Sequence, residues 1–515
     1  MFDWSHGYNV STGYTYGYYR ELAPNWLDFV AAIKGLLPPA RGPHGSFRYL
    51  ELGCGQGLGL CLLAAAHPAG DFVGVDFNPE HIGHARRLAE AAGLANVRFE
   101  EGDFLELAQD WPRRMGSFDY VTQHGIYSWL PPAVRAGLVK CIDAATHPGS
   151  LVYVSYNALP GWLSTVPFQH IARQLQLATG QAGPSALQAT AKLFESIEAA
   201  NSPLFRILPG LKTRLDAIKA QNPNYLVQEY LHDHWHPLWF SQVAGELGAI
   251  KLGFVGSAHL PEALMPALLP AAMRDLVLAQ ENPTLRQDVM DCLINQGFRR
   301  DVFCRGPLQS FANGASAPIM QVSLVLTTAP AGEVKVATTV GEAKVAPNIV
   351  GPVVEELGKG PRTIAQLTGL PQLRSEANVA IAIQAIILLV HAGVVMLAPT
   401  ETVPATSAQG LNRVIAKAVA NGAPYQYVAA PVLGTAIQTN DVDLLLLDAW
   451  LSQAGLDAAG LGEALVAGLA KLGRGLNSSD GLLTGDALNQ RAADLSQTFL
   501  TTKLPRWSSW GVVDG

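Results

Sequence analysis

Three acidic residues and a group of glycines near the N-terminal end have the types and spacing that chemistry requires. Glu51, Asp76 and Asp103 each lie at or near the end of an apolar run, and glycines 53, 55, 57 and 59 follow the first of them. A glycine-rich turn between a strand and a helix lets backbone N–H groups approach a bound nucleotide closely. The carboxylates would add hydrogen-bond acceptors and negative charge. The pattern therefore predicts a nucleotide-containing cofactor.

The glycine spacing narrows the choice of cofactor. A dinucleotide fingerprint reads G-x-G-x-x-G, whereas the spacing from Gly53 is G-x-G-x-G, with Leu58 where the third glycine would fall. A pyrophosphate binds best at a helix N-terminus without nearby carboxylates, and Glu51 lies two residues before the first glycine. S-adenosylmethionine (AdoMet) has no phosphate but carries an ammonium and a sulfonium, which a carboxylate suits. The loop favours AdoMet over a dehydrogenase cofactor.

The other two acids support this choice. Asp76 ends "GVD", 23 residues after Gly53, where it can accept hydrogen bonds from both ribose hydroxyls. Asp103 can accept from the adenine amino group, with Phe104 beside the ring. NAD enzymes share an acid at the position of Asp76, and each acid alone is also common as a helix cap or turn residue. Three acids at the ends of three successive strands together indicate AdoMet.

The elements that position these residues alternate between strand and helix. Buried strands are predicted at 47–53, 71–76, 96–103, 118–125 and 150–157. Such alternation predicts a parallel sheet with right-handed crossovers. Helices then follow over 165–235, and strand-like runs return at 249–258 and 298–306. We interpret these two runs as the last strands of the same sheet, which makes the helical block an insertion. The alternative is that they belong to a separate middle domain.

The C-terminal part has a different pattern. Residues 307–321 have the composition of a linker, and 351–398 read as helix, turn, helix, long helix and strand, the order of a winged helix. This block has few basic residues, so contact with protein is expected rather than with nucleic acid. The predicted units are 1–160 (cofactor-binding core with a tyrosine-rich lid), 161–240 (helical insertion for regulation or dimerisation), 241–310 (last strands or middle domain) and 311–515 (winged-helix-like domain).

Composition restricts the class of protein. A chain of 515 residues predicts two or three domains. A net charge of -7 with 15% charged residues gives no sign of a nucleic-acid surface. Five cysteines without a CxxC pair argue against disulfides and thiolate zinc sites and favour the cytoplasm. No metal site is expected, because "HDHWH" at 232–236 has no accompanying ligand cluster. No signal peptide is evident.

One apolar stretch, 379–398, has the length of a membrane span. Gln384 and His391 interrupt it, and no basic flank follows. We therefore expect a buried helix followed by a strand, and a soluble protein without membrane contact.

The residues that could contact the substrate of an AdoMet-dependent enzyme follow the fourth and fifth strands. The Asp/Asn-Pro-Pro-Tyr turn of DNA and glutamine N-methyltransferases is absent there. Aromatic faces can surround a cation, and a histidine can serve as a base or be purely structural. The candidate reaction residues are His124, Tyr127, Trp129, Tyr156 and Asn157.

Five tyrosines, at 8, 14, 16, 18 and 19, lie within twelve residues of the N-terminal segment 7–22. They form either an aromatic cover on the sheet edge or a lid whose hydroxyls reach the carboxylate of the cofactor. The candidate cofactor-binding residues are Tyr18, Tyr19, Glu51, Gly53, Cys54, Gly55, Gly57, Asp76, Phe77, Asp103, Phe104 and Gln123.

"LELGCGQG", "GVDFNPEHI" and "EGDF" resemble the first three motifs of the class I AdoMet-dependent methyltransferases, over about residues 45–160. The resemblance implies an α/β fold with a Rossmann-like seven-stranded sheet. It places Glu51, Gly53, Gly55 and Gly57 at the methionine part of AdoMet. It places Asp76 at the ribose, and Asp103 with Phe104 at the adenine.

"YLVQEYLHDHWHPLWF" and "INQGFRRDVFCRG" extend the resemblance, over nearly the whole chain, to bacterial methyltransferases with a methyltransferase regulatory domain. That group includes rickettsial protein lysine methyltransferases and implies a helical middle region and a C-terminal winged-helix-like α/β domain. The tyrosine-rich start departs from the rickettsial pattern. The expected function is methyl transfer to a protein lysine amine, with a possible homodimer. The alternatives are a small-molecule or glycan acceptor, or an AdoMet-binding regulatory protein without catalysis.

Overall fold

A seven-stranded sheet forms the centre of the molecule in a computed structural model that describes residues 6–8, 16–219, 221, 223–307, 309, 317–374, 376–399, 404–453, 455–478 and 481–514. The strand order is β3-β2-β1-β4-β5-β7-β6, and β7 runs antiparallel to both neighbours while the other pairs are parallel. The strands are β1 (Phe47–Leu52), β2 (Gly70–Asp76), β3 (Val97–Glu101), β4 (Phe118–Gln123), β5 (Thr146–Asn157), β6 (Leu252–Ser257) and β7 (Phe298–Arg305). The α/β prediction is confirmed, and the two late strand-like runs belong to this sheet.

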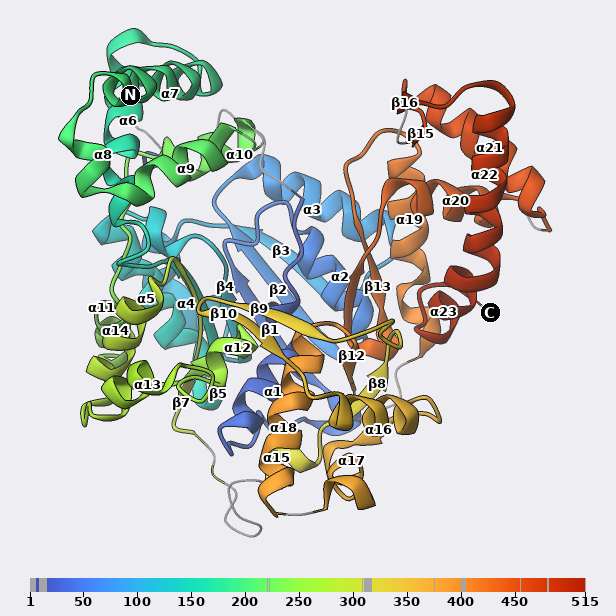
Figure 1. Cartoon of the computed structure of the whole chain (residues 1–515), viewed down its shortest axis with the longest axis horizontal. Helices are drawn as coiled ribbons and strands as arrows, with labels where there is room; N and C mark the ends of the chain where they lie inside the picture. Colours follow the sequence, from blue (N-terminus) through green and yellow to red (C-terminus); the bar gives the residue numbers. More distant parts are fainter. Residues whose placement is uncertain are drawn as a thin grey trace.

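Helices cover both faces of the sheet (Figure 1). Successive side chains of a strand point to opposite faces, so Tyr49 packs under one helical layer while Leu50 and Leu52 pack under the other. The first layer contains α1 (Pro24–Ile33), α2 (Leu58–Ala66) and α3 (Pro79–Ala91). The second contains α4 (Phe104–Arg114), α5 (Pro132–Ala145) and α11 (Phe240–Gly248).

The helical block between β5 and β6 is an insertion, as predicted. It has its own apolar core, in which Phe168, Phe194 and Tyr230 are buried. Its helices are α6 (Val166–Thr179), α7 (Gly183–Ala199), α8 (Pro203–Ile207), α9 (Pro209–Lys219) and α10 (Pro223–Tyr230). Three further helices lie between β6 and β7, namely α12 (Leu260–Ala263), α13 (Ala271–Leu278) and α14 (Pro283–Ile294).

The region after β7 begins with a small α/β unit. Its elements are α15 (Ala317–Met320), β8 (Ser323–Leu326), β9 (Lys335–Thr338), β10 (Gly341–Lys344), α16 (Pro347–Leu357), β11 (Arg362–Thr363), α17 (Ile364–Thr368), α18 (Glu376–His391) and β12 (Val395–Ala398). The expected helix and strand at 379–398 are confirmed as α18 and β12. Among the described residues no helix is long and apolar enough to cross a membrane. The winged-helix assignment itself stays a prediction.

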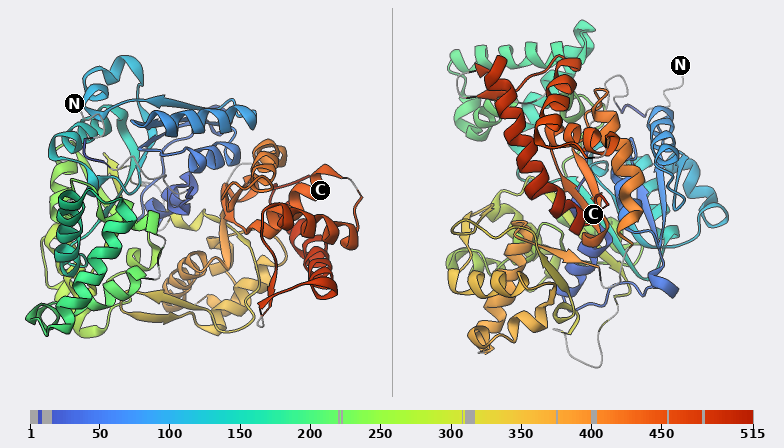
Figure 2. Two further views of the ribbon diagram at one scale, coloured as in Figure 1. Left: turned by 90° about the horizontal axis from the view of Figure 1, so that it is seen from above. Right: turned by 90° about the vertical axis from the view of Figure 1, so that its right-hand side faces the viewer.

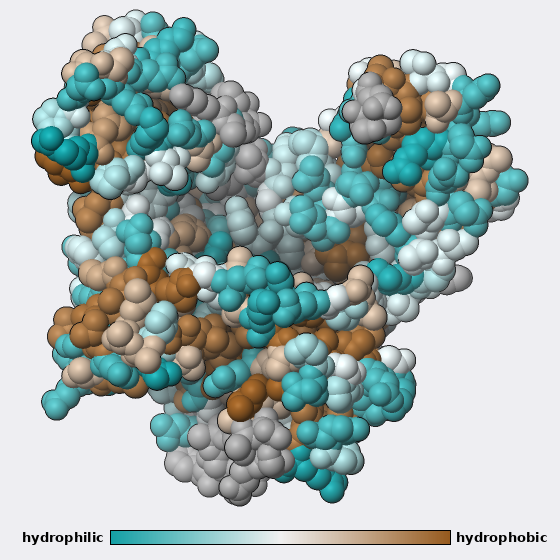
Figure 3. Space-filling view, viewed as in Figure 1, coloured by the Kyte–Doolittle hydropathy of each residue, from teal (hydrophilic) through white to brown (hydrophobic). Residues whose placement is uncertain are grey.

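A second C-terminal unit follows. It comprises α19 (Gln409–Val419), β13 (Tyr427–Ala430), β14 (Thr435–Gln438), α20 (Asp441–Ser452), α21 (Ala458–Lys471), β15 (Asn477–Ser478), β16 (Gly481–Leu482), α22 (Gly485–Thr498) and α23 (Leu504–Ser509). The hairpin β13–β14 packs against α2. The insertion and this unit stand as two arms (Figures 1 and 2), and Figure 3 shows a hollow between them.

Candidate active site

The glycine loop connects β1 to α2 in a tight turn. The Gly53 and Cys54 amides donate to the Val75 carbonyl at 2.8 and 3.0 Å. Gly57 has a φ of +74°, and a Cβ there would lie 2.4 Å from Cβ of Ala85. Left-handed backbone geometry and close packing both favour glycine, so the loop is shaped for a close approach of backbone to ligand.

Asp76 ties the glycine loop to the end of β2. Its Oδ2 accepts from the Gly55 amide at 2.9 Å, and its Oδ1 accepts from the Asn78 amide at 2.9 Å. The side chain is buried. The predicted ribose ligand is therefore also the anchor of the loop.

Glu51 lies at the carboxyl end of β1 with only 7% of its surface exposed. Burial, and then the negative charge of Asp76, raise the pKa of Glu51 to about 8. A cation placed beside Glu51 would favour its ionised form. The AdoMet ammonium and sulfonium are such cations, so this buried acid fits the cofactor.

A pocket runs between the glycine loop and the N-terminal segment 16–22. The residues that border it are Tyr16, Gly17, Tyr18, Tyr19, Leu22, Glu51, Gly53, Cys54, Gly55, Gln56, Gly57, Leu58, Gly59 and His124. The predicted methionine-binding residues are thus brought together, and Tyr19 closes the pocket from the other side.

A second, largely apolar pocket lies at the predicted adenine position. Phe77, Asp103, Phe104 and Trp129 border it, together with His6 and Tyr8 from the N-terminal end. Asp103 also caps α4 by accepting from the Leu105 amide at 2.6 Å, and its other oxygen contacts His6. The two roles considered for Asp103, helix cap and pocket residue, thus occur together.

Trp129 is not at the acceptor rim, where the sequence placed it. The 3-10 turn Tyr127–Trp129 directs its ring toward the adenine pocket and toward His232, with ring centroids 5.0 Å apart. Its predicted reaction role is therefore corrected to a wall of the adenine pocket.

A larger pocket of about 710 Å³ adjoins the cofactor pocket, because Tyr19 and His124 border both. Asn157 lies in its wall, as predicted. Other wall residues with charged or aromatic side chains are Trp162, Arg214, Tyr225, Glu229, Phe298 and Arg300. We call it the acceptor pocket.

His124 is a poor candidate for a base. Its ring stacks on Tyr19 with centroids 3.6 Å apart, and its Nδ1 lies 3.0 Å from the Tyr153 hydroxyl. Burial, and then the charge of Arg300, lower the pKa of His124 to about 3. A neutral imidazole with so low a pKa accepts a proton weakly, so His124 serves as a wall of both pockets.

Two predicted tyrosines point away from the pockets. The Tyr156 hydroxyl donates to Asp301 at 2.7 Å, and the Tyr127 hydroxyl contacts Glu246. Both rings are buried in the core beneath α4 and α5. Alternation along β5 turns Asn157 toward the acceptor pocket and Tyr156 to the opposite face, so the predicted reaction roles of Tyr127 and Tyr156 are wrong.

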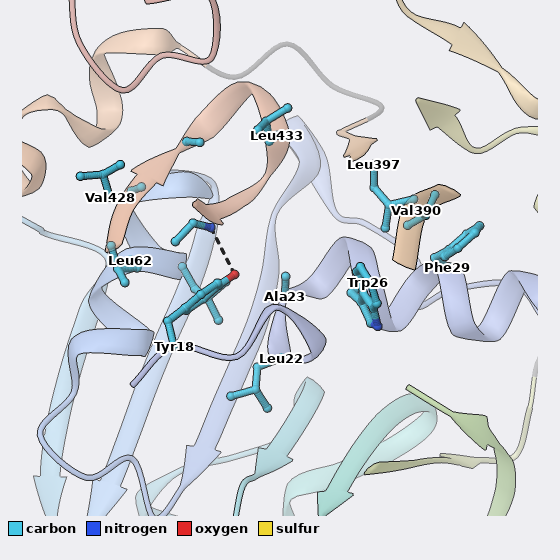
Figure 4. Packing of buried hydrophobic residues seen from close by; sticks show 14 of the residues in the cluster. Tyr18, Leu22, Ala23, Trp26, Phe29, Leu62, Val390, Leu397, Val428 and Leu433 are labelled. Carbon is cyan, nitrogen blue, oxygen red and sulfur yellow. Dashed lines mark hydrogen bonds between the residues drawn. The ribbon is translucent and has the colours of Figure 1, made fainter. Parts of the chain in front are cut away.

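Tyr18 does not offer its hydroxyl to the cofactor either. Its ring borders the cofactor pocket, but its hydroxyl contacts Thr435 and accepts from the Ala436 amide at 3.2 Å (Figure 4). In the N-terminal segment 16–22, Tyr18 faces the hairpin β13–β14 while Tyr19 faces His124. The C-terminal unit thus holds the backbone that places Tyr19.

A second contact joins the C-terminal unit to the glycine loop. His84 Nδ1 lies 2.7 Å from the Gln56 carbonyl, and its Nε2 lies 2.7 Å from the Tyr425 hydroxyl. The Tyr16 ring packs edge-on against Tyr425. No pattern in the sequence predicts these contacts. The prediction for Tyr14 lies outside the described residues.

Gln123, a predicted cofactor residue, is buried at the end of β4 and borders none of the three pockets described above. Its Nε2 donates to the Ser155 carbonyl at 3.2 Å, and its Oε1 has no hydrogen-bond partner among the described residues.

No group of three or more potential metal ligands occurs in the part of the chain that the structure describes.

The sheet order, the glycine loop and the acids at the strand ends together define an AdoMet-binding site of the class I methyltransferase type. AdoMet supplies an electrophilic methyl group. The residues of this chain shape the glycine loop, carry the groups predicted to bind the ribose and the adenine, and form the wall that the two adjoining pockets share.

Comparison with known proteins agrees with the geometry. Residues 43–178 match the model of a methyltransferase domain, and residues 222–305 match the predicted methyltransferase regulatory domain. An uncharacterized protein of Synechocystis is 33% identical over 456 residues, which cover 86% of this chain and 87% of the relative. An uncharacterized protein of Rickettsia prowazekii is 25% identical over 317 residues, which cover 61% of this chain and 55% of the relative.

The structure of PKMT2 from Rickettsia typhi in complex with AdoHcy shows the same overall fold. It superposes with a TM-score of 0.70 at 17% identity, over 94% of this chain and 98% of that chain. The chain therefore belongs to the class I AdoMet-dependent methyltransferases that carry a methyltransferase regulatory domain. AdoMet is its cofactor.

AdoMet affinity is expected to rise with pH up to about pH 8. Glu51 is protonated below its pKa of about 8, and the cationic cofactor favours the ionised form, so binding must release a proton. The association constant should rise by up to about tenfold per pH unit between about pH 6 and 8 and then level off. Calorimetry in two buffers of different ionisation enthalpy measures the proton release.

Two variants separate the effect of Glu51 from other titrations. Glu51→Gln should bind more weakly, without the proton release. Glu80→Gln, at an exposed acid in the first turn of α3, should retain the wild-type pH slope. Wild-type binding without proton release at about pH 7 would contradict the role given to Glu51.

Proposed function

We propose that this methyltransferase methylates the side-chain amine of lysine in a protein. The observation that carries the proposal is the acceptor pocket, which meets the cofactor pocket at Tyr19 and His124. Of the described residues that line it, Glu229 alone is acidic. A protonated amine carries the positive charge that would be attracted to that carboxylate.

The size of the molecule around the pocket supports a macromolecular acceptor. The insertion and the C-terminal unit leave a hollow between them, and α10 lies on the side of the insertion that faces it (Figures 1 and 3). Residues of α10 also line the acceptor pocket. The likeness to the rickettsial protein lysine methyltransferases supports the same acceptor class.

A second candidate is a small acceptor that carries both an amine and an anionic group. Arg214 and Arg300 line the same pocket and would attract a carboxylate or phosphate. This candidate differs from the first in the size of the labelled product.

Labelling of a native-cell lysate with tritiated AdoMet distinguishes the two candidates. With wild-type enzyme, a labelled protein that yields methyl-lysine after acid hydrolysis is the expected result. Label in the small-molecule fraction would favour the second candidate. Asp76→Ala enzyme should give neither product, and label on protein residues other than lysine would contradict the proposal.

A further inference from the structure

Glu229 stands out among the pocket residues because its helix directs it there. On α10, Val227 and Tyr230 are buried in the core of the insertion. Tyr225 and Glu229 are four residues apart, so they share the other face of the helix, and both line the acceptor pocket. The insertion therefore uses one helix face for its own stability and the other to supply an acid to the site.

The carboxylate is held in place from the core. Asn157 Nδ2, at the carboxyl end of β5, donates to Glu229 Oε1 at 3.3 Å. The Tyr225 side chain hydrogen-bonds to the same carboxylate. Burial raises the pKa of Glu229, while these bonds and the charge of Arg214 oppose the rise. A carboxylate that water reaches poorly is a stronger proton acceptor than an exposed one.

Two aromatic residues of the pocket, Trp162 and Phe298, already have a cation over the ring. The Arg214 guanidinium lies over the Trp162 ring at 4.2 Å, and Arg300 lies over Phe298 at 5.1 Å. These two faces are already in contact with cations. An incoming ammonium is therefore attracted to Glu229.

Several charged or titratable groups interact electrostatically with Glu229 or line the pocket. They are Tyr8 and Tyr19 from the N-terminal end, Arg214 from α9, Tyr225 and Tyr230 from α10, and His124 and Arg300 across the pocket. Burial raises the pKa of each of these tyrosines and lowers that of His124. At neutral pH Glu229 is thus the strongest proton acceptor among them.

We propose that Glu229 binds the acceptor ammonium and accepts its proton before methyl transfer. The inference rests on the proposed amine acceptor. The ammonium N–H bond breaks and the proton moves to a Glu229 carboxylate oxygen, which leaves a lone pair on nitrogen. That pair attacks the methyl carbon, a C–N bond forms, and the C–S bond breaks with its electrons moving to sulfur. The product is a methylated ammonium, and Glu229 returns its proton to solvent when the product leaves.

The Glu229→Gln variant tests this role, because glutamine keeps the size and the hydrogen bond to Asn157 but cannot take the proton. Initial rates of tritium transfer to lysine in native-cell lysate protein should fall about 100-fold or more at pH 7. The deficit should shrink by about tenfold per pH unit toward pH 10, because lysine, with a pKa of about 10.4, then supplies its own neutral amine. AdoMet affinity by calorimetry should stay within about twofold of wild type, since Glu229 does not line the cofactor pocket.

Two further variants serve as a conservative replacement and as a control. Glu229→Asp should recover part of the rate at pH 7 with the wild-type pH profile. Glu198→Gln, at an exposed acid that pairs with Lys212 on the same insertion, should match wild type throughout. A Glu229→Gln rate equal to wild type, or a deficit that does not change with pH, would overturn the role of Glu229. Wild-type label on residues other than lysine would instead overturn the proposed acceptor and this inference with it.

Discussion

Replacement of Asp76 with alanine is expected to weaken AdoMet binding by about 100-fold or more and to abolish measurable methyl transfer. The variant removes two predicted hydrogen bonds to the ribose hydroxyls. Hydrogen bonds to a charged group contribute about 1.5–3 kcal/mol each, so about 3–6 kcal/mol of binding free energy is at stake. The Gly55 and Asn78 amides also lose their acceptor, so the loop itself loosens.

Calorimetry of the purified protein measures this effect directly. Asp71→Ala is the matched control, because Asp71 lies at the start of the same strand, is exposed, and pairs with Arg48 and Arg98 outside the site. Its AdoMet affinity should equal that of wild type. Asp76→Ala binding within about threefold of wild type would contradict the ribose assignment.

The Asp76→Ala variant should also change the number of protons released on AdoMet binding, which calorimetry measures independently of affinity. The charge of Asp76 is one of the two causes that raise the pKa of Glu51. Its removal should therefore lower the pKa of Glu51, and any residual AdoMet binding should release less proton at about pH 7 than wild type does. A change in affinity without a change in proton release would indicate that the two acids do not interact.

Most of the core sheet could be predicted because its information is local. Each strand is a short apolar run bounded by turn residues, and the glycine loop and Asp76 lie directly at strand ends. Carboxyl ends of parallel strands meet at one edge of a sheet, so neighbours in this pattern become neighbours in space. Glu51, Asp76 and Asp103 were found from the sequence for that reason.

The acceptor pocket could not be predicted in the same way, because its residues come from distant segments. Glu229 is 72 positions along the chain from Asn157, which donates a hydrogen bond to it. Periodicity shows which face of α10 is apolar, but only the packing of the insertion on the sheet shows what Glu229 faces. The segment around 225–236 contributes to the family resemblance in the sequence, but the sequence does not indicate a role for Glu229.

The reaction roles predicted for Tyr127 and Tyr156 were wrong for a related reason. Aromatic residues beside a strand end are equally suited to a pocket wall and to the core, and a shift of one residue reverses the side they face. Tyr156 and Asn157 illustrate this, since one is buried beneath the sheet while the next lines the pocket. The partner of Tyr156 explains the choice, because Asp301 belongs to a buried ionic group on β7.

That ionic group gives the largest expected effect on stability. Arg299 is 2% exposed and donates to Asp291 at 2.5 Å and to Asp301 at 2.8 Å. Its guanidinium also lies over the Phe240 ring. Arg299→Leu leaves two fully buried carboxyl groups without their cation, and breaking such a pair costs about 3–5 kcal/mol. Arg98→Leu, which breaks an exposed pair with Asp71, should cost less than about 1 kcal/mol.

The Arg299→Leu deficit should also grow with pH. Burial raises the pKa of Asp291 and Asp301, and the charge of Arg299 opposes that rise. Without Arg299 the native state keeps both groups protonated, whereas the unfolded chain releases these protons above a pKa of about 3.9. Stability is then fully present below that pKa and is lost as pH rises toward the higher native pKa.

Amide hydrogen exchange in β7 is the suitable measurement, because a chain with several packed units has no single unfolding free energy. Protection of β7 should fall far more in Arg299→Leu than in Arg98→Leu, and more at pH 8 than at pH 6. Since β7 pairs with β5 along Leu151–Asn157, opening of β7 also displaces Asn157 and, through it, Glu229. The rate of methyl transfer should therefore fall as the protection of β7 against hydrogen exchange falls. Equal protection of β7 in Arg299→Leu and Arg98→Leu would show that the buried ionic group does not stabilise the acceptor side of the site.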